Sequence, residues 1–165
     1  MTCDVIIPVF NNAKVLPLTL KALFHQHLPP HWKIKIIISD DGSTDDTVTI
    51  ARQLCDLSGR NHQIITGEHA GAARARNRAL NQSKADIVFL LGADIILRQN
   101  ALWSHLNFHS LNPSLNQAAL GIVIWDPRVC PTPLMEWMNH GGSQNDYDNI
   151  LGEVSVDPNH YFYGS

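Results

Sequence analysis

Short apolar runs alternate along the chain with longer segments in which apolar residues recur every three or four positions. The runs are rich in β-branched residues, which is typical of buried strands, and they lie at Val5–Ile7, Ile34–Ile38, Gln63–Thr66 and Asp86–Leu91. The segments between and after them predict helices over Ala13–His27, beginning at Ser43, over Gly71–Gln82 and over Ala101–Ser110. Strand and helix alternate four times, which predicts an α/β fold with a doubly wound, mostly parallel sheet and helices on both faces.

The last third of the chain is less regular. Leu120–Trp125 is apolar enough for a further strand, and Leu134–Met138 predicts a short helix after two prolines. Gly141–Tyr161 has the composition of loops.

The net charge of the chain bears on which classes of partner it can bind. The net charge is −3 and the charged residues form no basic face, so nucleic acid is not an expected partner. The longest apolar run, inside Ile87–Leu91, is far too short to cross a bilayer. Three widely spaced cysteines without metal-type spacing, and an N-terminus without a secretory signal, predict a cytoplasmic protein with reduced thiols. Further segments or partners would be needed to hold it at the inner face of a membrane.

Unusual polar segments follow three of the predicted strands. They are Pro8–Asn12 after the first strand, Asp40–Ser43 after the second and Gly92–Asp94 after the fourth. In an open parallel sheet, ligands bind outside the carboxyl ends of the strands. The convergence of three such segments therefore predicts one ligand-binding crevice.

The adjacent carboxylates Asp40 and Asp41 allow two interpretations. Asp and Gly at this place favour a turn, and Ser43 would then cap the following helix, with Asp46 three residues further on. A turn needs only one carboxylate, however, and another can accept a hydrogen bond from a nucleobase imide or a ribose hydroxyl. The segment lacks the alternating ligands of a calcium loop.

Arg76 stands out on the third predicted helix because of its helical neighbours. The residues three and four positions away are all apolar: Ala72, Ala73, Ala79 and Leu80. A guanidinium on an apolar stripe needs an anionic partner, which a protein carboxylate or a ligand phosphate would supply. Arg74 and Arg78 lie together on another face, where we expect them to be solvated.

Asp94 follows a buried strand and a glycine. It either starts a helix or holds a metal ion. One carboxylate is enough for Mg²⁺ or Mn²⁺ when a diphosphate and waters supply the remaining oxygen ligands. His105 and His109 are four residues apart on a predicted helix, but they lack the glutamate and the third ligand of a zinc site, so we expect packed or solvent-facing histidines.

Four segments together resemble the family 2 glycosyltransferases. They are Val5–Asn11, Ile37–Asp45, Gly71–Asn77 and Phe89–Asp94, which stand in the family's order and spacing and cover residues 1 to about 110. The second segment is highly specific. The resemblance implies a Rossmann-like GT-A fold that binds a nucleoside diphosphate sugar.

The resemblance also implies a base pocket. Pro8, Phe10 and Asn11 would line it, Asp41 would meet the base, and Asp40 would lie in the same donor site. A UDP- or dTDP-linked donor is favoured, because a carboxylate such as Asp41 can accept a pyrimidine imide proton.

The resemblance assigns the diphosphate and the metal to the other two segments, Gly71–Asn77 and Phe89–Asp94. Arg76 would lie near the base or the diphosphate. The family's Asp-x-Asp motif is here Gly92-Ala93-Asp94, so that Ala93 would border the donor and Asp94 alone would hold Mn²⁺ or Mg²⁺. The loss of the first carboxylate weakens the expected ribose contact.

We therefore interpret residues 1–165 as one truncated GT-A domain. Residues 1–110 form the nucleotide-sugar-binding half and residues 111–165 begin the acceptor-side half, with the general base expected beyond Ser165. The predicted activity is transfer of the sugar, by inversion, to a glycan, lipid or protein acceptor. The alternative is a non-catalytic fragment that only binds the donor. A Rossmann oxidoreductase or a nucleotidyltransferase would need a glycine-rich first loop, where this chain has Pro8-Val9-Phe10-Asn11.

Overall fold

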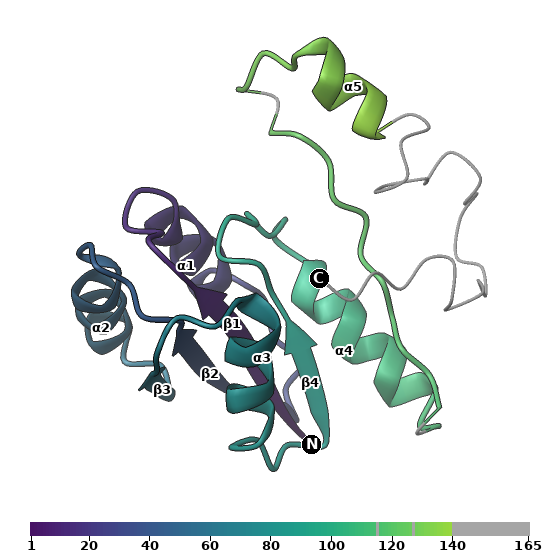
Figure 1. The fold of residues 1–165 in the computed structure, drawn as a ribbon. Helices are drawn as coiled ribbons and strands as arrows, with labels where there is room; N and C mark the ends of the chain where they lie inside the picture. The colour runs from purple at the N-terminus through teal and green to yellow at the C-terminus, as the bar shows by residue number, and fades with distance from the viewer. Residues whose placement is uncertain (115, 127, 140–165) are drawn as a thin grey trace. The chain divides into compact units, whose positions relative to one another are not determined.

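The computed structural model describes residues 1–114, 116–126 and 128–139. These residues belong to two compact units, Met1–Gln117 and Ala118–Ser165. In the first unit strand and helix alternate throughout, as the hydrophobic pattern predicts (Figure 1). Its elements are β1 (Thr2–Val9), α1 (Leu16–Phe24), β2 (Lys33–Asp40), α2 (Thr47–Ser58), β3 (His62–Thr66), α3 (Ala72–Leu80), β4 (Ile87–Leu90) and α4 (Ala101–Leu111).

The four strands form one parallel sheet in the order β3-β2-β1-β4. The chain moves outward from β1 to β2 and β3, then returns to place β4 on the other side of β1. The strand order therefore reverses between β1 and β4, which is where ligands bind in doubly wound sheets. The predicted α/β class is confirmed.

Side chains alternate between the two faces of β1 and β2, and both faces are covered. Val5, Ile7 and Ile38 are fully buried in the larger core cluster, whose helical members come from α1, α2 and α4. Ile6 and Ile37 point the other way and pack with Ala79 of α3. Burial on both faces explains why these strands read as unbroken apolar runs.

One predicted helix start was wrong. The helix expected from Ser43 begins at Thr47, and the residue that precedes it, Asp46, makes no side-chain cap. The Ser43 hydroxyl instead accepts the main-chain N–H of Asn11 at 2.9 Å. A partner 32 residues away has replaced the local cap that the sequence suggested.

The described residues of the second unit contain α5 (Pro133–Asn139), which confirms the predicted helix over Leu134–Met138. The strand predicted over Leu120–Trp125 was wrong, because these residues pair with no other strand in the described part of the chain. The loop predicted over Gly141–Tyr161 lies outside the described residues. Among the helices that the structure describes, none is long and apolar enough to span a membrane.

Candidate functional site

The loops after β1 and β2 are joined by hydrogen bonds at the carboxyl edge of the sheet. Asn11 exchanges two bonds with the second loop: its N–H donates to the Ser43 hydroxyl at 2.9 Å, and its side-chain oxygen accepts the N–H of Thr44 at 2.9 Å. Next along the chain, the N–H of Asn12 donates to the Thr47 hydroxyl at 2.7 Å. Two of the three segments predicted to converge are thus in direct contact.

Asn11 also bends the first loop. Its φ is +51°, in the left-handed region that asparagine tolerates better than most residues. The N–H of Phe10 donates to the Asn12 side chain at 2.8 Å, which closes the turn. The turn leaves Phe10 41% exposed, while Pro8 stays buried within β1. Phe10 and Asn11 therefore stand at the surface of the predicted pocket, and Pro8 lies beneath it.

The two adjacent carboxylates have different roles. Asp40 folds back on its own loop, where its oxygens accept the N–H groups of Gly42 and Ser43 at 3.2 Å. This is the turn interpretation of the sequence. Gly42 is required in that turn, because its φ is +80° and a Cβ there would lie 2.9 Å from the main-chain nitrogen of His69.

Asp41 instead connects β2 to the start of α3. One of its oxygens accepts the N–H of Ala70 at 3.0 Å and the other accepts the N–H of Gly71 at 2.8 Å. The side chain is 3% exposed, and the His69 Nδ1 atom lies 2.8 Å from Oδ2. Burial by itself raises the pKa of the Asp41 carboxyl, but the two N–H groups and the His69 imidazole outweigh burial and lower that pKa below its usual value.

Arg78 is the guanidinium that reaches this carboxylate pair. Its Nη1 donates to the main-chain oxygen of Asp40 at 2.8 Å, and its Nη2 lies 3.8 Å from the Asp41 carboxylate. The expectation that Arg78 is solvated was wrong. Its contact spans 38 residues of sequence, and helical spacing alone contains no signal for it.

Arg76 does not sit at the centre of the buried stripe of α3. That stripe is Ala75 and Ala79, both fully buried, whereas Ala72 and Ala73 are exposed. The buried face predicted around Arg76 was therefore wrong, because packing against the sheet decides which face of α3 is buried. Arg76 itself is half-buried beside the stripe, and Arg74 is exposed.

His69, in the loop between β3 and α3, was not predicted from the sequence. Its ring stacks on the Phe10 ring, with centroids 4.1 Å apart and planes 23° apart. The imidazole therefore joins the first loop to the Asp41 carboxylate. A lone histidine in a polar loop gives no sequence signal for such a contact.

The segment after β4 presents one carboxylate. Asp94 is exposed, whereas Ala93 is 7% exposed and its carbonyl accepts the buried Thr19 hydroxyl at 2.8 Å. The Ala93 side chain thus lies in the hydrophobic core, not at the surface of the site. A Cβ on Gly92 would lie 3.0 Å from the Asp94 carboxylate, so the glycine leaves room for that side chain.

A protein-only metal cage is absent among the described residues: they contain no cluster of three or more His, Cys, Asp or Glu side chains able to hold an ion. His105 packs edge-on against Phe89. The pKa of its imidazole is lowered mainly by burial and also by the nearby His109. This agrees with the expected packing role for His105. Cys3, Cys55 and Cys130 form no disulfide with one another.

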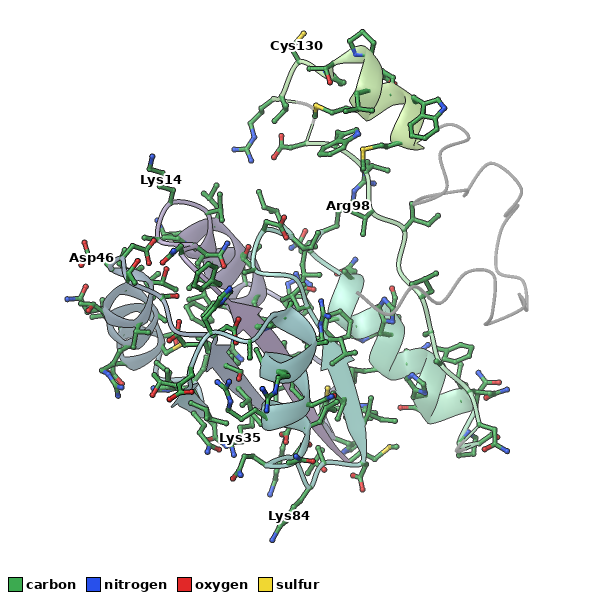
Figure 2. All side chains as sticks on the ribbon, viewed as in Figure 1. Lys14, Lys35, Asp46, Lys84, Arg98 and Cys130 are labelled. Carbon is green, nitrogen blue, oxygen red and sulfur yellow. The ribbon has the colours of Figure 1, made fainter. Side chains whose placement is uncertain are left out.

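A hollow of about 330 Å³ lies at the opposite end of the sheet. Residues at the start of the strands line it, among them Thr2 and Lys33. Figure 2 shows Lys35 and Lys84, which also line it, far from Lys14 and Asp46 of the loops after β1 and β2. This hollow is separate from the candidate site.

Comparison with known proteins agrees with this arrangement. The chain is 35% identical over 105 residues to the putative teichuronic acid biosynthesis glycosyltransferase TuaG of Bacillus subtilis (strain 168). This alignment covers 64% of this chain and 40% of that protein. It is 28% identical over 121 residues to the minor teichoic acid biosynthesis protein GgaA of the same organism, in an alignment that covers 72% of this chain and 27% of that protein. The chain thus spans well under half the length of these two relatives.

Solved structures share the fold. The mannosyltransferase PcManGT from Pyrobaculum calidifontis, in complex with GDP-Man and Mn²⁺, aligns with a TM-score of 0.63 at 23% identity, over 76% of this chain and 36% of that chain. S. aureus TarS 1-349, in complex with UDP-GlcNAc, aligns with a TM-score of 0.60 at 23% identity, over 73% of this chain and 37% of that chain.

The parallel sheet with helices on both faces is therefore the fold of the GT-A glycosyltransferases. The family model for Glycosyl transferase family 2 matches residues 4–164, nearly the whole sequence. This chain belongs to that family.

Proposed function

We propose that this chain is the donor-binding part of a glycosyltransferase that takes a nucleoside diphosphate sugar. The observation that carries the proposal is the grouping of loops at the carboxyl edge of the sheet. Bonds from Asn11 join the first loop to the second, and Asp41 joins the second to the start of α3. Asp94 follows the strand on the other side of β1. This is the place where doubly wound sheets bind nucleotides.

In this proposal each part of the donor meets a different loop. Phe10 offers an exposed ring to the base, and Asp41 is the carboxylate that would accept a base imide proton. Arg76, half-buried on α3, would meet the diphosphate, since a guanidinium pairs well with phosphate oxygens. Asp40 would act indirectly, because its oxygens already hold the turn at Gly42.

The donor set at Asp94 fits Mn²⁺ or Mg²⁺ on one condition. The carboxylate is exposed and supplies at most two oxygens, whereas a hard divalent cation takes about six ligands. Donor diphosphate and waters would have to supply the rest. The ion, when bound, would neutralise charge on the diphosphate leaving group.

Sugar transfer by inversion to a glycan, lipid or protein acceptor is part of the same proposal, with the base that activates the acceptor on a later segment. The unit boundary after Gln117 supports a division into a donor half and an acceptor half near residue 110. A donor-binding role without turnover is the second candidate, favoured by Gly92 in place of a carboxylate. Release of UDP from UDP-sugars in the presence of an acceptor separates the two.

Calorimetric titration with UDP, dTDP, GDP and UMP in the presence of Mn²⁺ tests the donor site. We expect the diphosphates to bind more tightly than UMP, because Arg76 and the metal both act on the diphosphate. UDP and dTDP should bind more tightly than GDP. Undetectable heats for all four nucleotides would contradict the proposed function.

A further inference from the structure

The His69 imidazole makes two contacts that a nucleobase would also make. It stacks on an aromatic ring, that of Phe10, at a centroid distance of 4.1 Å. It also places a ring nitrogen 2.8 Å from an oxygen of the Asp41 carboxylate. A flat nitrogen heterocycle thus already covers both the exposed ring and the buried carboxylate.

The imidazole is the movable member of the groups around Asp41. The other donors at hydrogen-bonding distance are the main-chain N–H groups of Ala70 and Gly71, which the start of α3 fixes in place. The His69 side chain is 59% exposed, whereas the carboxylate beneath it is 3% exposed. Rotation of the imidazole about its Cα–Cβ bond would uncover Asp41 without moving the main chain, which packs against Gly42.

We propose that His69 occupies the base position of the donor site and competes with the base of the incoming nucleotide. The inference rests on the proposed function, because it takes Phe10 and Asp41 as the base pocket. The base displaces the imidazole and takes over its stacking and its contact with the carboxylate. A compound without a base leaves His69 in place.

The competition has a measurable cost in affinity. When a protein is competent to bind in only a fraction of its molecules, the apparent dissociation constant rises by the inverse of that fraction. If the imidazole covers the pocket in about four molecules of every five, its removal tightens nucleotide binding about fivefold. Diphosphate binding through the metal is unaffected, because it does not use the base pocket.

The test compares UDP with inorganic pyrophosphate, each titrated with Mn²⁺ into wild type and His69→Ala. The matched control is His62→Ala, which removes a histidine that also faces an aspartate, with Nε2 3.3 Å from Asp56, but lies on β3 away from the loops. We expect His69→Ala to bind UDP about fivefold more tightly and pyrophosphate unchanged. His62→Ala should match wild type for both ligands.

A second measurement uses the wild-type protein alone, so that it stands even if His69→Ala folds poorly. The Cε1–H resonance of His69 should shift on addition of UDP, as the imidazole leaves the Phe10 ring, and stay fixed on addition of pyrophosphate. Weaker or unchanged UDP binding by His69→Ala, or a resonance that UDP does not move, overturns the inference while leaving the donor site intact. Failure of UDP to bind any variant contradicts the proposed function itself.

Discussion

The guanidinium of Arg78 lies directly over Gly67. A Cβ at Gly67 would be 2.1 Å from the Cζ atom of Arg78, closer than any two such atoms can approach. The glycine that follows β3 thus leaves the space in which Arg78 crosses to the main-chain oxygen of Asp40, 2.8 Å away.

Gly67→Ala and Arg78→Ala should therefore destabilise the fold through the same contact. Each alone should lower the free energy of unfolding by about 1.5–3 kcal/mol, the usual contribution of a hydrogen bond that involves a charged group. The double variant should be no less stable than Arg78→Ala, because the added methyl then meets empty space. Urea denaturation of all four proteins measures the coupling. Additive losses would show that the two residues act separately.

Asp41→Asn should lower stability at neutral pH by about 2–3 kcal/mol, because an amide nitrogen would face one of the two main-chain N–H groups that the carboxylate now accepts. The folded state lowers the pKa of Asp41, so its contribution is fully present above the unfolded pKa of about 4 and is lost as pH falls through the lower folded pKa. The difference in stability between wild type and Asp41→Asn should thus narrow as pH falls below about 4.

Chemical denaturation at pH 7 and pH 3 measures that difference. Asp46→Asn is the control, because Asp46 is exposed and its side chain makes no cap on α2. A difference for Asp41→Asn that stays constant with pH would contradict the role given to the carboxylate.

Arg76→Ala should weaken UDP binding about tenfold, equivalent to about 1.4 kcal/mol, while Arg74→Ala changes it little. Arg76 is half-buried on α3 and Arg74 is exposed, so only Arg76 is positioned firmly enough to bind a phosphate oxygen well. Calorimetry with UDP gives the affinities, and melting temperatures recorded alongside separate binding from folding. Equal losses for the two variants would remove Arg76 from the donor site.

Asp94→Asn should abolish the coupling between Mn²⁺ and UDP. In wild type each ligand should tighten the binding of the other by the same factor, as linkage requires. Gly92→Asp should strengthen the coupling by adding a carboxylate, after small movements of the Asp94 and Ile95 side chains that a Cβ would meet at 3.0 Å. Titration of Mn²⁺ with and without UDP decides both. If Asp94→Asn keeps the full coupling between Mn²⁺ and UDP, Asp94 does not bind the metal and only forms the turn after β4.

The sequence was sufficient for those parts of the fold that depend on local periodicity. The strands containing Ile6 and Ile37 are buried on both faces, and a continuous apolar run records this directly. The face that α3 buries could not be predicted in this way. Packing against the sheet determines which side chains of α3 point inward, and the spacing of Arg76 and Arg78 in the sequence does not. Ser43 does not form the cap that its local sequence predicts, for the same reason: its partner, Asn11, belongs to another loop.

Three main-chain N–H groups of the first loop, those of Asn11, Asn12 and Ala13, each donate to a side chain of the segment from Ser43 to Thr47. Exchange of these amide hydrogens with solvent requires that segment to move away. The two loops therefore open as one cooperative unit, and a single fluctuation exposes both sides of the site at once. A substitution that loosens Thr47 would consequently accelerate exchange at Asn12, on the other loop, without touching β1.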